Sequence, residues 1–258
     1  MNRILRRYLA PAVVFVAVLA AWEFFVRAAG IQGFLLPPPS DIVRTVAEEW
    51  PIVWPAGLFT LREALGGLVG GTILGIAVAF AVARWTAIRA GVQPLAVAAG
   101  SAPIIALAPI TNQWFGITNP VSKMAVVAVM VFFPVMINMV RGLADVGGAK
   151  VELMNSLAAP DFTTLWKVRL PNALPYLLSA LRVAVALSLI GAVVTEYFGG
   201  SRDALGVYIS QQAGLTRMAE AWAGIVVATL LGAALQLLVM GAERILIPWP
   251  PARRLTPA

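Results

Sequence analysis

The chain has 258 residues, of which 60% are apolar and 12% are charged, with a mean hydropathy of +0.86 and a formal net charge of +7. Soluble domains carry roughly 25% charged residues, so this composition excludes an ordinary soluble globule and predicts an all-α polytopic membrane protein. Basic loops orient membrane helices, which explains the positive charge without a nucleic-acid partner. The absence of cysteine and histidine removes disulfides, histidine bases and most zinc or haem sites. We therefore expect no catalytic residues and no metal site.

Six apolar stretches are long enough to cross a bilayer, which takes roughly 20 mostly apolar residues. They are predicted at residues 8–26, 61–83, 91–110, 121–140, 176–198 and 221–247. The first stretch runs into EFFVRAAG, which has no clear small-x-small cleavage site, so we expect a retained helix and not a signal peptide. The whole chain, 1–258, is predicted to be one transmembrane domain.

A short segment at residues 34–50 separates the first two predicted helices. It reads FLLPPPSDIVRTVAEEW, with a proline turn, then Ser40 as a helix N-cap, then amphipathic spacing. We expect this segment to lie along the outer membrane interface.

Glycines mark the second predicted helix, which reads GGLVGGTILGIAVAFAVA. Three pairs are four residues apart: Gly66 with Gly70, Gly67 with Gly71, and Gly71 with Gly75. Small residues at this spacing let helix backbones approach closely, and we favour packing within the chain over a subunit interface.

Prolines mark the third predicted helix, at Pro94, Pro103 and Pro109. Proline bends a helix and frees carbonyl groups, which a membrane protein tolerates where protein or a water-filled path satisfies the backbone. Kinked interior helices of this kind suit a transport pathway.

Charged residues inside membrane helices are rare and are functional candidates by default. Glu23 and Arg27 lie four residues apart and are predicted to pair on one helix face. The adjacent Arg62 and Glu63 are expected to anchor the second helix at the outer interface. Arg182 is expected to extend its side chain back to the cytoplasm.

Three side chains are candidates for the solute pathway or its gate: Glu196, Asn138 and Met136. Glu196 lies near the outer end of the fifth predicted helix, where it is either a helix-end carboxylate in water or part of a gate. Asn138 and Met136 lie on the fourth helix, where either a place along the path or ordinary packing fits them.

The distribution of Lys and Arg predicts the orientation of the chain. With the N-terminus in the cytoplasm, twelve of the 19 Lys and Arg residues fall in inside segments, and six fall in outside segments or helix ends. Cytoplasmic loops carry the excess of Lys and Arg, so both termini and the segment between the fourth and fifth helices are predicted to be cytoplasmic.

That segment is too polar and too interrupted to span. Met154, Leu157 and Phe162 give partly helical apolar spacing among polar residues. Pro160 interrupts the spacing, so two short helices with a bend are predicted, and Pro171 is expected to close the segment before the next span. A short amphipathic segment offers one face to another molecule, and we interpret this one as a cytosolic docking element.

The same segment resembles the EAA loop of ABC importer permeases. That signature has a glutamate, a glycine six positions later, an aliphatic residue ten further on, and then Leu-Pro. The corresponding positions are Glu152, Ala158, Val168, Leu170 and Pro171. Four other stretches resemble the branch that imports sulfonates, taurine, nitrate, bicarbonate or pyrimidine-type vitamin precursors: LLPPPSDIV, PLAVAAGSAPIIALAPITNQWFGI, FFPVMINMVRGL and NALPYLLSALRVAVALSLIGAVVTEYFGG. The resemblance covers roughly residues 34–241.

The loop departs from the signature in two places. Leu153 and Met154 replace the two alanines after the glutamate, and Ala158 replaces the glycine. Glycine often ends a helix in a left-handed conformation, which alanine adopts at an energetic cost.

The resemblance implies a type I ABC importer permease fold, with a core at residues 58–247 and a coupling loop at residues 143–175. It also implies two ABC ATPase subunits, a second permease copy in a homodimer and an extracytoplasmic solute-binding protein, at a bacterial inner membrane. The sequence has no G-x-x-x-x-G-K-[ST] loop, so ATP and Mg are expected in the partner ATPase and no cofactor in this chain. The residues implied in coupling are Glu152, Met154, Leu157, Ala158, Phe162, Val168, Leu170 and Pro171.

In such an importer, closure of the ATPase dimer would push on the two loops and rock the permease pair from inward-open to outward-open. The expected solute is a small anion, such as a sulfonate, taurine or nitrate, or a pyrimidine precursor. A secondary transporter or channel is the alternative, and it would show an inverted repeat with buried ion ligands. No repeat relates the two halves of the sequence. A membrane enzyme fits less well, because the usual histidine base and metal ligands are absent.

Overall fold

The computed structural model describes residues 3–83, 98–100 and 102–247. The described residues contain helices and connecting segments but no strand, which confirms the predicted all-α class. The elements are α1 (Arg3–Ala28), α2 (Pro39–Glu48), α3 (Trp50–Ala83), the 3₁₀-helix η1 (Ile104–Leu107), α5 (Ala108–Phe115), α6 (Pro120–Ala144), α7 (Gly148–Ser156), α8 (Asp161–Thr164), the π-helix η2 (Leu165–Arg169), α9 (Leu170–Glu196), α10 (Leu205–Gly214) and α11 (Met218–Leu246).

Five helical segments are long and apolar enough to cross a membrane: Leu9–Ala28, Trp50–Ala83, Pro120–Ala144, Asp161–Glu196 and Met218–Leu246. They correspond to five of the six predicted spans. Of the span predicted at residues 91–110, residues 91–97 and 101 lie outside the described residues, and so does Pro94. The remainder is not one regular helix, because Pro103 precedes η1 and Pro109 lies in the first turn of α5.

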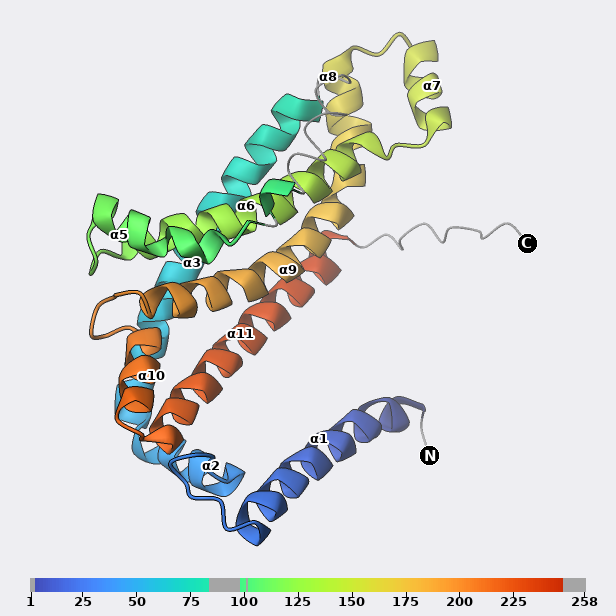
Figure 1. Ribbon diagram of the computed structural model, residues 1–258. Coiled ribbons are helices and arrows are strands. Elements are labelled where there is room, and N and C mark those ends of the chain that lie inside the picture. Colours follow the sequence, from blue (N-terminus) through green and yellow to red (C-terminus); the bar gives the residue numbers. More distant parts are fainter. Residues whose placement is uncertain (1–2, 84–97, 101, 248–258) are drawn as a thin grey trace.

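The long helices run back and forth between two ends of the molecule (Figure 1). One end carries α7 and α8, and we call it the loop end. The other carries α2, α10 and the turn between α5 and α6, and we call it the far end. Four of the arginines counted for the orientation, at positions 84, 89, 253 and 254, lie outside the described residues.

α3 and α6 pack closely against each other in the core. A Cβ on Gly67 would lie 2.4 Å from the side chain of Val127, and one on Gly71 would lie 2.4 Å from the carbonyl oxygen of Ala128. Side chains do not fit at such distances, so glycine is required for this approach. The glycine spacing therefore serves packing within the chain, as predicted.

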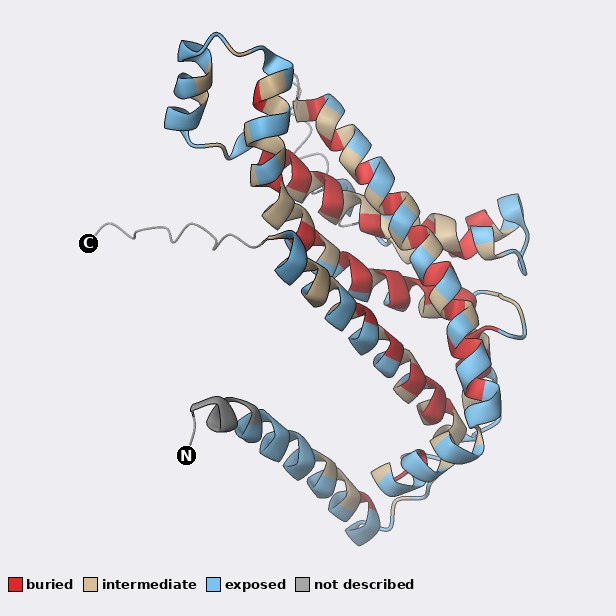
Figure 2. Cartoon of the chain, turned by 180° about the vertical axis from the view of Figure 1, so that it is seen from behind, coloured by how far each residue is buried: buried red, intermediate tan, exposed pale blue. Residues whose placement is uncertain are grey.

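α1 is set apart from this core. Figure 2 shows buried residues where α3, α6, α9 and α11 face one another, whereas α1 is exposed on most of its surface. The predicted pair at its end is present: Arg27 Nε donates to Glu23 Oε1 at 2.5 Å. Glu23 also accepts hydrogen bonds from the backbone N–H and hydroxyl of Ser40, at 3.0 and 2.8 Å. This joins α1 to the start of α2.

The predicted role of Ser40 as an N-cap is wrong. α2 begins at Pro39, with Pro38 as its N-cap residue, and Ser40 lies inside the first turn. Proline suits the first helical position because its missing N–H would have no helical partner there. The Ser40 N–H is instead satisfied by the carboxylate of Glu23.

Two spans begin earlier than predicted. α3 begins at Trp50 and not at residue 61. α8, η2 and α9 run continuously from Asp161 to Glu196, so Pro171 does not close the loop. In the π-helical turn before it, the N–H of Leu170 donates to the carbonyl of Leu165, five residues back. This change of hydrogen-bond register precedes the proline, which lacks a donor, and the helix continues through it.

Candidate functional site

The loop between α6 and α9 contains the two short helices predicted for it. α7 ends at Ser156, and Ala158 follows with a left-handed backbone, φ +47°. This is the conformation for which glycine is usual, so the alanine at this position is strained. Pro160 then serves as the N-cap residue of α8. The bend at this proline and the strained alanine were both expected from the sequence.

Apolar side chains on α7, on α8 and on the turns that follow each of them are uncovered. Leu157 is 67% exposed and Phe162 is 69% exposed, and Leu153 and Trp166 are exposed as well. Leu153 and Leu157 are four residues apart, and so are Phe162 and Trp166, so each pair shares a helix face. The rings of Phe162 and Trp166 lie 6.0 Å apart. The loop end therefore presents apolar groups that nothing in the described chain covers.

The residues predicted for coupling have two environments. Five are exposed, namely Glu152, Leu157, Ala158, Phe162 and Pro171, and three are half-buried, namely Met154, Val168 and Leu170. Leu170 packs against the core between α3 and α6. Leu153 is absent from the predicted set, although its spacing from Leu157 is the signal that identifies it.

A polar clamp joins the two ends of the loop. The side-chain amide of Asn172 donates to the carbonyls of Gly142 and Asp145, at 2.9 and 3.0 Å. The hydroxyl of Tyr176 hydrogen-bonds the Asp145 carboxylate. A Cβ on Gly142 would lie 2.7 Å from Cα of Ala173, so the backbones also meet closely here. The end of α6 and the start of α9 are thereby held together, a contact that the sequence reasoning did not predict.

The far end holds a cluster of charged residues inside the protein. Glu63 of α3, Lys123 of α6 and Glu196 of α9 are only 2%, 1% and 1% exposed. Lys123 donates to the side-chain carbonyl of Asn112 at 3.0 Å and to the backbone carbonyl of Ile117. The expectation that Glu63 is an interface anchor is wrong; Arg62 beside it is exposed.

Glu196 organises the start of α10. One carboxyl oxygen accepts from the Thr60 hydroxyl at 2.7 Å, and the other accepts from the N–H of Gly206 at 2.5 Å. The Thr60 oxygen accepts from the N–H of Leu205 at 2.9 Å. Two of the free N–H groups at the helix start are thus satisfied, and a negative group is favourable there. Because Glu196 is buried, it is not a helix-end carboxylate in water.

α10 itself was not predicted. It is attached to the segment before α3, because the hydroxyl of Tyr208 donates to Glu49 Oε2 at 3.2 Å. Burial, reinforced by the nearby Glu49 charge, raises the pKa of this phenol, so Tyr208 remains a donor. At the other end of the bundle, Arg182 does not extend freely to water but pairs with Glu243 of α11.

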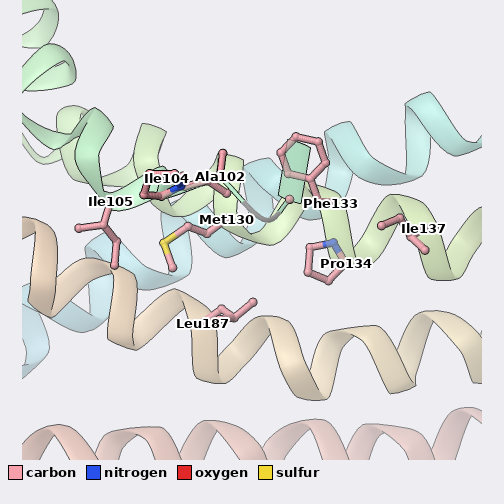
Figure 3. Close-up of a pocket in the computed structure, with 10 residues that line it drawn as sticks. Ala102, Ile104, Ile105, Met130, Phe133, Pro134, Ile137 and Leu187 are labelled. Carbon is pink, nitrogen blue, oxygen red and sulfur yellow. The ribbon is translucent and has the colours of Figure 1, made fainter. Parts of the chain in front are cut away.

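An apolar cavity of about 530 Å³ lies between α6, α9 and the segment around η1. In Figure 3 the side chains of Met130 and Leu187 face each other from α6 and α9, and Ile105 lies on the η1 side. The predicted pathway residues of α6 lie elsewhere: Met136 is buried in the core, and Asn138 donates to the carbonyl of Pro134 at 2.8 Å. Their part in a pathway stays a prediction.

Comparison with known proteins defines the class. Residues 71–250 match the family described as binding-protein-dependent transport system inner membrane component. The match covers more than half of the chain, which therefore belongs to this family: it is a multi-pass permease subunit of an ABC importer. The resemblance carried by the loop is confirmed, and a secondary transporter or channel is not favoured.

Named relatives lie within this class. The chain is 32% identical over 242 residues to the formylaminopyrimidine transport permease protein ThiX of Halalkalibacterium halodurans. This alignment covers 93% of this chain and 96% of the relative. It is 29% identical to the putative aliphatic sulfonates transport permease protein SsuC of Bacillus subtilis, over 93% of this chain and 86% of the relative. A crystal structure of an amino acid ABC transporter with histidines has the same fold, with a TM-score of 0.61 at 15% identity. The superposition covers 77% of this chain and 96% of the chain in that structure.

Proposed function

We propose that the loop end is cytoplasmic and docks an ABC ATPase, and that two copies of this permease work with two ATPase subunits in a bacterial inner membrane. ATP and Mg would bind in the ATPase, which alone hydrolyses ATP. An extracytoplasmic binding protein delivers the solute at the far end. The permease pair then alternates between inward-open and outward-open states, with both termini in the cytoplasm.

The observation that supports this proposal is the uncovered apolar surface of α7 and α8. Two leucines stand exposed on α7 and directly after it, and α7 is too short to cross a membrane. Two aromatic rings stand exposed at the start of the continuous helix that leads into α9. Interfaces concentrate their binding energy in a few such side chains. Leu157 and Phe162, with Met154 beside them, supply the buried anchor in the complex. Glu152 directs its carboxylate toward a donor on the ATPase.

The clamp can transmit a movement of the loop to the membrane-spanning helices. Asn172 and Tyr176 tie the first and last turns of the loop together, so a push on α7 or α8 moves α6 and α9 as a pair. Val168, Leu170 and Pro171 lie on the continuous helix that carries this motion, and the left-handed Ala158 sets the bend between α7 and α8.

At the far end, Glu196 is proposed to act in the outer gate through its hold on α10. Met136 and Asn138 are proposed to adjust α6 as the pathway opens. The transported solute is a small anion or a pyrimidine precursor, since relatives named for aliphatic sulfonates and for a formylaminopyrimidine cover most of the chain.

Docking is tested with Leu157→Asp, which puts a charge into the proposed apolar contact at a cost of several kcal/mol if the charge cannot reach water. Asn155→Asp adds the same charge at an exposed polar position of α7 and is the matched control. We expect Leu157→Asp permease to reach the membrane normally but to lose its ATPase in a pull-down, while the control retains it. A Leu157→Asp complex that keeps its ATPase and transports at the parental rate would refute the docking assignment.

Orientation is tested separately by cysteine labelling, because the chain has no cysteine of its own. A Ser156→Cys variant is expected to stay unmodified when an impermeant thiol reagent is added outside intact cells. It should react once the membrane is opened. Labelling from the outside would place the loop end on the wrong side.

A further inference from the structure

The cavity between α6, α9 and η1 has walls of unusual backbone. η1 is a 3₁₀-helix preceded by Pro103, and Pro134 lies inside α6 on the wall of the cavity. Pro134 has no N–H, so the carbonyl of Met130, four residues earlier, lacks its usual intrahelical donor. At membrane depth, irregular backbone is tolerated where it lines a cavity or is buried in protein. This is the arrangement expected of a pathway wall, and it differs from a lipid-facing helix surface.

The cavity has a definite chemical character. The ten described residues that line it are all apolar, and they include Phe133 and Met130. None carries an ionisable side chain, and Lys123 is engaged at the far end. Transfer of an anion into such surroundings without a charged or N–H partner is costly. The polar group that Pro134 frees is the carbonyl of Met130, which accepts hydrogen bonds and repels negative charge.

We propose that this cavity is a solute site for an uncharged, planar heteroaromatic molecule that carries amino or imino hydrogen-bond donors, and that sulfonates and other anions are excluded. This rests on the proposed function of the chain as a solute pathway. The volume of about 530 Å³ lies in the ordinary range for small-molecule sites, roughly 300–1,000 Å³. The apolar walls and Phe133 contact the ring, and the freed carbonyl of Met130 accepts from its N–H groups.

The test uses the purified permease–ATPase complex in lipid nanodiscs, with a 4-aminopyrimidine and taurine as probes. Saturation-transfer NMR detects binding even at millimolar affinity. We expect the aminopyrimidine to bind and taurine not to bind. Phe133→Ala should weaken aminopyrimidine binding about tenfold, whereas Phe24→Ala, the same change on exposed α1, should leave it unaltered.

A second variant reverses the selectivity. Ile137→Arg places a guanidinium at the cavity wall and should lower aminopyrimidine binding while creating taurine binding. Co-purification of the ATPase with each variant reports that the permease is folded and coupled. Taurine binding to the parental complex, binding of neither probe, or equal binding by the parental and Phe133→Ala complexes would overturn the proposal. If the ATPase still co-purifies in those cases, the importer assignment stands and only the solute class fails.

Discussion

The two ends of the bundle differ in which side chains are buried and which are exposed. At the far end, two carboxyl groups and an ammonium are buried. Glu196 accepts hydrogen bonds from Thr60 and Gly206, and Lys123 donates to Asn112 and Ile117. At the loop end, leucine and aromatic side chains are exposed, and the clamp supplies the polar contacts between α6 and α9. The far end therefore finds its partners largely within one chain, whereas the apolar groups of the loop end are left uncovered by the described residues. Substitutions at the two ends should accordingly fail in different ways.

The largest expected effect is at the far end. Lys123→Met removes the buried ammonium that donates to the carbonyls of Asn112 and Ile117 and should lower the free energy of unfolding by about 3–5 kcal/mol, because each hydrogen bond from a charged group contributes about 1.5–3 kcal/mol. Lower membrane levels and a lower unfolding temperature in detergent would show it. The double variant Lys123→Met, Glu63→Gln should recover part of the loss. Lys150→Met, at an exposed position of the loop end, is the control and should have little effect. Equal stability of the two single variants would contradict the contrast between the ends.

A substitution in the clamp should have an intermediate effect on stability. Asn172→Ala leaves the carbonyls of Gly142 and Asp145 without this donor and should cost about 1–3 kcal/mol of stability. Because the ATPase contacts remain, the complex should still assemble, but solute-stimulated ATP hydrolysis should fall. Asn155→Ala, on the exposed surface of α7, is the matched control for assembly and stability. A variant with unchanged coupling would show that the clamp is not on the route from loop to spans.

A smaller effect, of opposite sign, is expected at Ala158. Replacement by glycine removes the cost of the left-handed backbone and should stabilise the loop by about 1 kcal/mol. Hydrogen exchange of the α7 amides would report slower opening. The same change at Ala159, which has no positive φ, should be neutral or destabilising. Faster exchange in Ala158→Gly would argue against strain at this position.

The smallest effect on the isolated permease is predicted for Leu157→Ser. The side chain is exposed, so the free energy of unfolding should change by no more than about 0.5 kcal/mol. Val127→Ser, in the buried core at the α3–α6 contact, should instead destabilise by several times more, because a hydroxyl replaces buried methyl groups. Thermal unfolding of the two purified variants, without ATPase, is the measurement. Comparable losses would mean that Leu157 already packs against its own chain.

Local patterns predicted the spans, the α3 glycines and the bend at Pro160, because each depends on residues close in sequence. The Glu23–Arg27 pair was predictable for the same reason, at a spacing of four. The far-end cluster was not, since Glu63, Lys123 and Glu196 come from three separate helices and only packing brings them together. The clamp likewise joins residues about 30 apart. Pro171 misled the prediction because a π-turn changes the hydrogen-bond register, which no side-chain pattern reveals.

The π-turn at Leu165–Arg169 also sets a direction of rotation. A π-turn amounts to one extra residue in an α-helix, and each residue advances a helix by about 100° around its axis. Deletion of one residue in this turn would therefore swing α8, and the face carrying Phe162 and Trp166, by roughly a quarter turn relative to α9. The residues of the membrane-spanning part would keep their orientation around the helix axis. The extra residue thus sets the direction in which the exposed ring of Phe162 faces relative to the membrane-spanning part of the helix.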